Sequence, residues 1–278
     1  MRSLLTFLIL LSLLSSATLY SGQIVDLSGA WDFGIDPQEV GIAESWFDGS
    51  APLPNRINVP GAWNAQGIGD QSERLFSDYP GPAWYRRTVD IPADWAGRIV
   101  WLKFGGVHRY AEVWVNGKRV GEHIGYPAPF KFDVTEFVTP GRQAVIAVRV
   151  DARQRKDVDP LVGCFDIIDA VHITWGGLYR GVELEATEAD RIEDVFVVPR
   201  IADRAAEVRV TLGRSDSSGP LSVIVRIRDK DGQIAGSGEA KLDAGQTSAT
   251  VPTQIFGLKL WSPKDPYLYS ATVTLTDG

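Results

Sequence analysis

The chain has 278 residues, of which 44% are hydrophobic and 23% charged, and its formal net charge is −7. This length accommodates two domains that each bury a core, and this composition excludes a disordered, collagen-like or coiled-coil protein. We expect no nucleic-acid partner, because phosphate binding needs clustered Lys and Arg, which this acidic sequence lacks.

Residues 1–20 follow the order of a secretory signal peptide. Arg2 precedes an apolar run over residues 4–14, and small residues follow the run up to Ala17. A membrane anchor is the alternative, but the run is only about half of the ~20 apolar residues that cross a bilayer. We therefore expect cleavage near Ala17, a secreted or periplasmic protein, and no membrane partner.

Strand patterns dominate from Ile24 onward, and no long apolar stretch has helical spacing. Residues 99–104 are rich in β-branched and aromatic side chains, and two glycines close this run. Residues 111–120 alternate polar and apolar side chains, and Asn116-Gly117 supplies two residues that tolerate positive φ in a hairpin turn. With a further strand over residues 145–150, the sequence predicts an all-β jelly-roll sandwich over residues 21–188.

The strand pattern changes near residue 189, where the strands become shorter, more polar and more regularly spaced. Residues 208–212 and 221–227 alternate, and Gly232 suits a left-handed turn position. The closing strand covers residues 269–275. Roughly six or seven strands in about ninety residues predict an immunoglobulin-like β-sandwich over residues 189–278.

Metal-binding and nucleophile motifs are weak in this sequence. His108, His123 and His172 match no zinc motif, and the single cysteine, Cys164, forms neither a thiolate cluster nor an intrachain disulfide. We therefore expect no metal or other cofactor, and we interpret each histidine as a surface or hydrogen-bonded side chain. Gly236-Ser237-Gly238 resembles a nucleophile elbow only superficially, and we interpret it as a turn between polar strands.

Paired carboxylates are the remaining catalytic candidates. Glycoside hydrolysis needs one group to protonate the leaving oxygen and another to attack the sugar or to activate water. Asp157, Asp159, Asp166 and Asp169 cluster in a connection that is rich in charge and proline. A solvated loop is the simpler interpretation of such a cluster.

Several short motifs, taken in order, carry a family resemblance that no single one of them carries. They are Leu27–Phe33, Val59–Trp63, Ala83–Arg87, Ile91-Pro92, Val113–Gly117, Gly121–His123, Pro129–Thr135, Gly176–Arg180, Leu260–Pro263 and Pro266–Tyr269. The series resembles the amino-terminal domains of glycoside hydrolase family 2, which includes β-galactosidases, β-glucuronidases and β-mannosidases.

This resemblance implies a galactose-binding-like jelly roll, also called the sugar-binding domain, followed by an immunoglobulin-like sandwich. In the family these domains lead into a catalytic (β/α)8 barrel, which this sequence lacks, so the resemblance assigns no catalytic residue to it. In the family a loop before the Gly-Gly-x-x-Arg segment lends an acidic residue to the barrel's pocket. Asp166 and Asp169 lie closest to that place and are our substrate-binding candidates.

The remaining motif residues have structural interpretations. We expect Trp31, Trp63, Trp84 and Trp114 to serve packing rather than sugar stacking, because a buried aromatic removes a large apolar area from water and an indole N–H needs one partner. We expect Arg180 to fix its loop, because a guanidinium can satisfy several acceptors at once.

Three hypotheses of function remain open. The first is the non-catalytic front portion of a secreted family 2 glycosidase, with carbohydrate and the catalytic barrel as partners. The second is a stand-alone carbohydrate-binding module or lectin. The third is an adhesin-like scaffold of two sandwiches, which would bind a protein and show no dependence on sugar.

Overall fold

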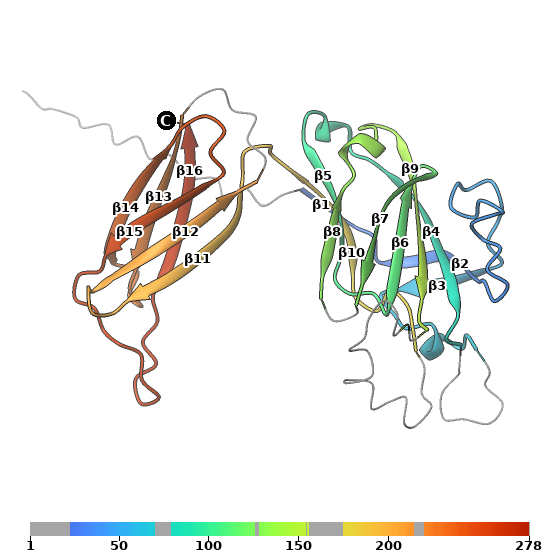
Figure 1. Ribbon diagram of the computed structural model, residues 1–278, viewed down its shortest axis with the longest axis horizontal. Helices are drawn as coiled ribbons and strands as arrows, with labels where there is room; N and C mark the ends of the chain where they lie inside the picture. Colours follow the sequence, from blue (N-terminus) through green and yellow to red (C-terminus); the bar gives the residue numbers. More distant parts are fainter. Residues whose placement is uncertain are drawn as a thin grey trace, which may run out of the picture.

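The computed structural model describes residues 23–69, 79–125, 128–153, 155, 175–213 and 220–277. Within these ranges the regular elements are β-strands and three short 3-10 turns, which confirms the prediction of an all-β protein. Figure 1 shows two β-sandwiches side by side, with β1–β10 in the first and β11–β16 in the second. In the part of the chain that is described, no helix is long and apolar enough to cross a membrane.

The first sandwich packs a four-stranded sheet, in the order β1-β10-β5-β8, against a six-stranded sheet, in the order β3-β2-β4-β9-β6-β7. Its strands are Gln23–Asp26 (β1), Gly29–Ile35 (β2), Asn55–Val59 (β3), Pro82–Asp90 (β4), Ile99–Phe104 (β5), Tyr110–Val115 (β6), Lys118–Ile124 (β7), Phe130–Asp133 (β8), Gln143–Asp151 (β9) and Val182–Thr187 (β10). Most spatial neighbours are not consecutive in the chain. This crossed antiparallel connectivity agrees with the expected jelly roll.

The alternation of side chains explains both the strands and the core between the sheets. On β5, Val100, Leu102 and Phe104 are buried, while Trp101 and Lys103 point to the other face. The hairpin between β6 and β7 turns at Asn116, with a φ of 51°, and Gly117, with a φ of 77°, which confirms the predicted turn.

The motif tryptophans are packing residues, as the sequence predicts. Trp31, Trp63 and Trp84 are completely buried, and Trp114 is 5% exposed. The indole N–H of Trp31 donates to the carbonyl of Leu27 at 2.8 Å, so burial leaves this polar group satisfied. None of the four is available to stack on a sugar.

The outer face of the six-stranded sheet carries a second, smaller apolar cluster. Trp84 and Trp114 lie there, with ring centroids 5.0 Å apart, and Trp46 and Phe47 from the connection between β2 and β3 cover them. The buried carboxylate of Asp36 accepts the Trp84 indole N–H at 3.0 Å. This cover buries both faces of the sheet along β4, β9 and β6.

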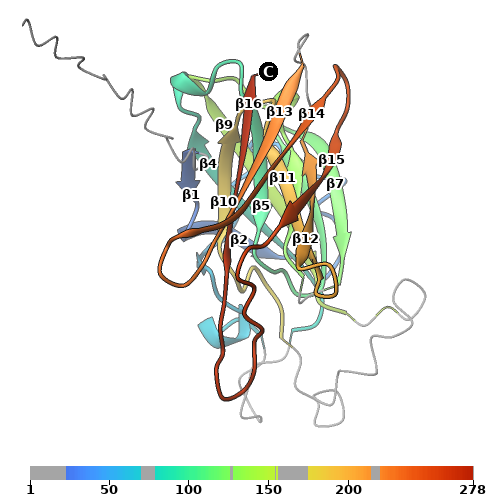
Figure 2. The same cartoon turned by 90° about the vertical axis from the view of Figure 1, so that its left-hand side faces the viewer.

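The second sandwich packs the sheet β11-β12-β15 against the sheet β14-β13-β16. Its strands are Ile192–Arg200 (β11), Ala205–Leu212 (β12), Leu221–Arg228 (β13), Ile234–Leu242 (β14), Ser248–Gln254 (β15) and Ser270–Asp277 (β16). Figure 2, which looks from the side of this sandwich, shows its strands in front of those of the first sandwich. Gly232 has a φ of 80°, which confirms the predicted left-handed turn position.

The interpretation of Gly236-Ser237-Gly238 as a turn is wrong. These residues lie inside β14 and pair with β13. A Cβ on Gly236 would lie 2.3 Å from the carbonyl oxygen of Gln254, so the glycine is required by the close approach of β15. The same observation rules out a nucleophile elbow, because Ser237 follows no strand-to-helix turn.

A group of four side chains, here named the Trp101 clasp, joins the two sandwiches. It consists of Trp101, Lys131, Arg191 and Glu193. The Lys131 ammonium lies 4.4 Å and the Arg191 guanidinium 4.9 Å from the Trp101 ring centroid. Glu193 pairs with Arg191 at 2.8 Å and also accepts a hydrogen bond from Lys131. Lys131 of the first sandwich and Arg191 beside β11 both lie within cation–π distance of the ring, so Trp101 links the two sandwiches.

Candidate functional site

The predicted substrate-binding residues, Asp166 and Asp169, lie outside the described residues, as do Asp157 and Asp159. The structure does describe both ends of the segment that carries them. These ends show where the segment leaves the first sandwich and where it returns. The contacts at these two ends therefore show how the segment that carries the aspartates is attached to the first sandwich.

The segment leaves the first sandwich at the end of β9. The carboxylate of Asp151, which is 3% exposed, accepts the backbone N–H of Arg153 at 3.0 Å and also pairs with its guanidinium. Arg153 pairs with Glu39 as well, at 2.6 Å, and this hydrogen bond lowers the pKa of Glu39. Two residues further on, the backbone N–H of Arg155 donates to the Tyr110 hydroxyl at 3.2 Å.

The segment returns at Gly176-Gly177, which we name the Gly-Gly turn. The backbone N–H and carbonyl of Gly177 exchange hydrogen bonds of 3.0 Å with His108. A Cβ on Gly176 would lie 2.2 Å from the Trp63 ring, and a Cβ on Gly177 would lie 2.7 Å from the Tyr85 hydroxyl oxygen. Packing against two buried aromatic residues therefore explains why the sequence has two glycines here.

A series of stacked side chains continues from the Gly-Gly turn to the surface. The His108 ring stacks on Trp175 at a centroid distance of 3.9 Å, and Trp175 meets Tyr179 edge to face at 5.2 Å. The Arg180 guanidinium lies 5.7 Å from the Tyr179 ring centroid. Arg180 is thus held at the end of a rigid aromatic row, although its own side chain is exposed.

The histidines have the structural roles that the sequence indicates, as far as the structure describes them. His108 is buried in the aromatic row, and the His123 ring stacks on Phe130 at 3.9 Å. Burial lowers the pKa of His123, so this imidazole is neutral at pH 7. His172 lies outside the described residues, and no group of three His, Cys, Asp or Glu within the described ranges is arranged to hold a metal ion.

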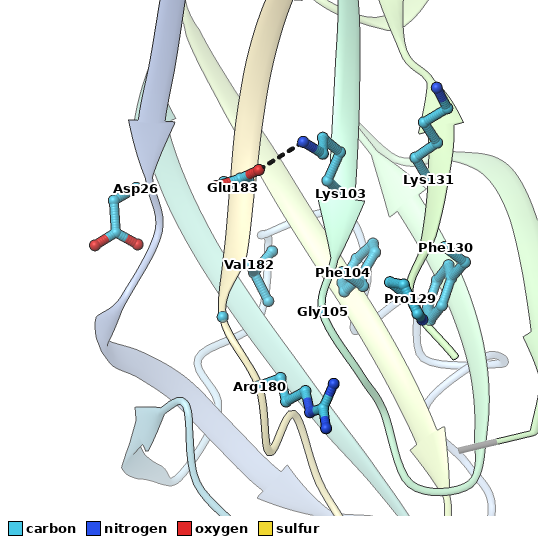
Figure 3. Close-up of a pocket in the computed structure, with 11 residues that line it drawn as sticks. Asp26, Lys103, Phe104, Gly105, Pro129, Phe130, Lys131, Arg180, Val182 and Glu183 are labelled. Atoms are coloured by element: carbon cyan, nitrogen blue, oxygen red, sulfur yellow. Dashed lines mark ion pairs between the residues drawn. The ribbon is translucent and has the colours of Figure 1, made fainter. Parts of the chain in front are cut away.

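Next to Arg180 the surface is hollowed to a volume of about 660 Å³. We name this cavity the Arg180 hollow. It is lined by Asp26, Lys103, Phe104, Gly105, Pro129, Phe130, Lys131, Arg180, Gly181, Val182 and Glu183. These residues come from β1, β5, β8 and β10 and from the chain ends beside them, so the hollow lies over one end of the four-stranded sheet (Figure 3).

The charged side chains of the hollow differ in how they are paired. Lys103 forms ion pairs with Glu183 at 2.8 Å and with Glu185 at 3.1 Å. Lys131 pairs with Glu193 in the Trp101 clasp. The expectation that Arg180 fixes its loop through hydrogen bonds is not met, because its side chain points outward and donates to no acceptor among the described residues.

A second hollow, of about 330 Å³, lies on the six-stranded sheet and also contains arginines. These arginines are already engaged. Arg56 pairs with Asp32 at 2.7 Å, Arg86 donates to the carbonyl of Ala51 at 2.6 Å, and Arg87 donates to the carbonyl of Ser28 at 2.9 Å. The Arg180 hollow is therefore the better candidate for binding a ligand.

Sequence reasoning did not identify this hollow. Lys103 and Glu183 lie on the outer face of β5 and β10, whose inner-face residues are apolar. This alternation is the sequence signal that could have identified them. The pairing of β5 with β10 brings the two residues side by side. That pairing joins segments about eighty residues apart, which local patterns do not reveal.

Comparison with protein families agrees with this architecture. The family described as "Glycosyl hydrolases family 2, sugar binding domain" matches residues 24–187, and "Glycosyl hydrolases family 2" matches residues 191–278. The chain belongs to glycoside hydrolase family 2. The two matches coincide with the two sandwiches, so the resemblance identified from the short motifs is confirmed.

Two curated relatives of this chain are longer proteins. The β-galactosidase of Thermoanaerobacter pseudethanolicus is 34% identical over 203 residues, which cover 71% of this chain and 26% of the relative. The β-glucuronidase of Paenibacillus borealis is 29% identical, covering 92% of this chain and 43% of the relative. The chain therefore spans less than half the length of either relative.

Among solved structures, a β-glucuronidase from Ruminococcus gnavus in complex with D-glucaro-d-lactam superposes with a TM-score of 0.69 at 23% sequence identity. The superposition covers 92% of this chain and 43% of that one. At this identity the likeness establishes a shared fold in this region.

Proposed function

We propose that this chain is the non-catalytic portion of an exported family 2 glycoside hydrolase, and that it supports a catalytic (β/α)8 barrel which hydrolyses terminal β-linked sugars. The observation that carries the proposal is the coverage of the relatives. Two consecutive family 2 matches fill residues 24–187 and 191–278, yet the matched β-glucuronidase is covered over only 43% of its length. The resemblance to the family assigns the acid/base and the nucleophile to the barrel.

The proposal predicts that this chain has no glycosidase activity of its own. The purified chain is to be incubated with the 4-nitrophenyl β-glycosides of glucuronic acid, galactose and mannose, and nitrophenol release is to be compared with a buffer blank. Release no faster than the blank supports the proposal. Saturable turnover that survives gel filtration with the chain would place the chemistry within these residues and overturn it.

The nucleotide sequence of the gene tests whether a catalytic barrel is encoded after these residues. We expect the reading frame to continue past codon 278 into a sequence of alternating strands and helices, and we expect the complete protein to cleave one of the same glycosides. A stop codon at that position, with no barrel encoded in an adjacent frame, would contradict the proposal.

Asp166 and Asp169 are proposed to contact the substrate once the barrel is present. In the complete protein, replacing both with Ala is expected to raise KM with little change in kcat, because contacts made equally to substrate and transition state act as uniform binding. The matched control is the Asp157→Ala, Asp159→Ala protein, which removes two charges from the same segment. Equal KM values for the two double variants would remove the assignment.

Export is proposed from residues 1–20 alone. Expressed with its own amino terminus in a Gram-negative bacterium, the chain is expected in the periplasmic fraction with a mass that corresponds to cleavage near Ala17. An uncleaved chain in the cytoplasmic fraction would contradict this part of the proposal.

The second candidate function is a carbohydrate-binding module or lectin, and the Arg180 hollow is the observation that favours it. Titration calorimetry against a panel of glycans tests this candidate directly. Uniformly absent heat, together with unchanged protein spectra, would leave the support of a barrel as the function.

A further inference from the structure

The Arg180 hollow combines features of a small-molecule site that the support of a catalytic barrel does not use. Its volume of about 660 Å³ lies within the roughly 300–1,000 Å³ that ligand pockets occupy in proteins. Its apolar lining includes Phe104, Pro129, Phe130 and Val182, and its charged groups stand around that lining (Figure 3). A ligand with one apolar face and several polar substituents matches such a lining.

Arg180 is the cation of the hollow that has no carboxylate partner among the described residues. Lys103 and Lys131 are both paired with glutamates, and Asp26 accepts from the Ser28 hydroxyl at 2.7 Å. Figure 3 shows the Arg180 side chain extending from the chain before β10 toward the side of Phe104 and Gly105. A guanidinium presents a planar fork of donors that matches a carboxylate in a bidentate geometry.

The opposite side of the hollow provides both donors and acceptors. The Lys103 ammonium has three N–H donors, of which Glu183 and Glu185 engage two, and the Glu183 carboxylate has oxygens that accept from hydroxyl groups. Groups of both kinds are needed to bind vicinal hydroxyls, because each hydroxyl donates one hydrogen bond and accepts others.

We propose that the Arg180 hollow binds a sugar acid, with the ligand carboxylate on Arg180, its hydroxyls on Lys103 and Glu183, and its ring over Pro129 and Phe130. This site lies on the first sandwich itself and rests on the second candidate function, for which it names the ligand class, and it requires no catalytic domain. It gives the chain a means of holding an acidic glycan independently of any hydrolysis.

The backbone of the hollow supplies a steric test. A Cβ on Gly181 would meet no atom within 4 Å, and the φ of this residue lies outside the region that strains L-residues. Because Gly181 lines the hollow and a Cβ there meets no clash, we expect a leucine at this position to occupy part of the hollow without disturbing the strands. The variant Gly181→Leu is expected to fill the space that the sugar ring occupies.

The experiment is a titration of the purified chain, followed by calorimetry and by ligand-observed NMR, with two probes that differ at one carbon. Methyl β-D-glucuronide carries a carboxylate where methyl β-D-glucoside carries a hydroxymethyl group. We expect the glucuronide to bind at least ~10-fold more tightly than the glucoside, since a charge-assisted bidentate pair distinguishes them. Sodium acetate at the same concentration is expected to show no saturable binding.

Three variants locate the site. Arg180→Gln is expected to weaken glucuronide binding about 10-fold and to remove the preference over the glucoside. Gly181→Leu is expected to abolish the binding of both. Arg226→Gln changes an exposed arginine on β13 of the second sandwich and is the matched control, with binding unchanged.

The proposal is overturned by any of three results: no saturable glucuronide binding, binding that both hollow variants retain at full strength, or equal affinity for glucuronide and glucoside. Circular dichroism and thermal melts are to be recorded for every variant. Because Arg180 is exposed, Arg180→Gln leaves the fold intact and keeps the test decisive even if Gly181→Leu proves unstable. Absence of glycosidase activity has no bearing on these outcomes, so the two proposals fail separately.

Discussion

Replacing Gly177 with alanine should destabilise the first sandwich through two separate effects at the Gly-Gly turn. The φ of Gly177 is 129°, outside the left-handed α region and in a range populated almost only by glycine, so an L-residue there costs about 1–3 kcal/mol. The added Cβ would also lie 2.7 Å from the Tyr85 hydroxyl oxygen and 3.0 Å from the Gly61 carbonyl oxygen. Overpacking of this kind typically costs about 1–3 kcal/mol. We therefore expect the free energy of unfolding to fall by roughly 2–6 kcal/mol, which lowers Tm by about 5–20 °C in a domain of this size.

Thermal and urea unfolding followed by tryptophan fluorescence measures this loss, because eight of the nine tryptophans precede residue 189 and so report on the first sandwich. Gly97→Ala is the matched control. Gly97 has a φ of 80°, nearer the left-handed α region, and a Cβ there would meet nothing within 4 Å, so Gly97→Ala carries a positive-φ cost of about 1–2 kcal/mol without the clash. Combining Gly177→Ala with Tyr85→Phe should recover about 0.5–3 kcal/mol, since the phenylalanine lacks the clashing oxygen. Equal costs for Gly177→Ala and Gly97→Ala, together with no recovery, would refute the reasoning.

Three further predictions concern single side chains. Asp36→Ala removes the acceptor of the Trp84 indole and of the N–H groups of Val40 and Gly41. In urea unfolding it should lower the free energy of unfolding by about 3 kcal/mol or more, because three donors lose their partner. The control Asp94→Ala, at an exposed position, should lower it by less than ~0.5 kcal/mol. Asn116→Gly and Asn116→Ala both lose the side-chain hydrogen bonds to Phe137 and Val145. Because glycine adopts the positive φ of this turn without strain and alanine does not, the glycine variant should have the higher Tm. A lower Tm for the glycine variant would contradict this. Lys131 and Arg191 lower the pKa of Glu193, so its contribution to stability is present at neutral pH and is lost as the pH falls below the ordinary glutamate value of 4.5. The difference in Tm between the wild type and Glu193→Gln should therefore shrink on acidification, and a difference that grows would be incompatible with the ion pairs.

Local sequence patterns predicted the strands and turns well, because strand alternation and turn preference depend on residues that are close in sequence. Asn116-Gly117 and Gly232 both turn as expected, since only residues that tolerate positive φ fit those positions. Gly236 and Gly238 were misinterpreted for the opposite reason. Their lack of a side chain serves the close approach of β15, which is a tertiary cause with no local signature.

The candidate site could be predicted only in outline. The sequence placed Arg180 in a family motif, but its position beside Tyr179, which in turn meets Trp175 edge to face, is a set of side-chain contacts that no spacing rule supplies. The ion pair of Lys103 with Glu183 depends on the register of β5 against β10. Buried polar anchors such as Asp36 were missed altogether, because a lone aspartate between apolar residues indicates a turn as readily as a buried acceptor.

The Trp101 clasp has a consequence for building chimeric proteins from members of the family. A crossover at the boundary near residue 189 keeps each sandwich whole, yet it separates Trp101 and Lys131 from Arg191 and Glu193. A hybrid that inherits only half of these side chains loses the contacts that orient one module on the other. Donor parents should therefore be chosen to match at all four positions, or the crossover should be moved beyond Glu193.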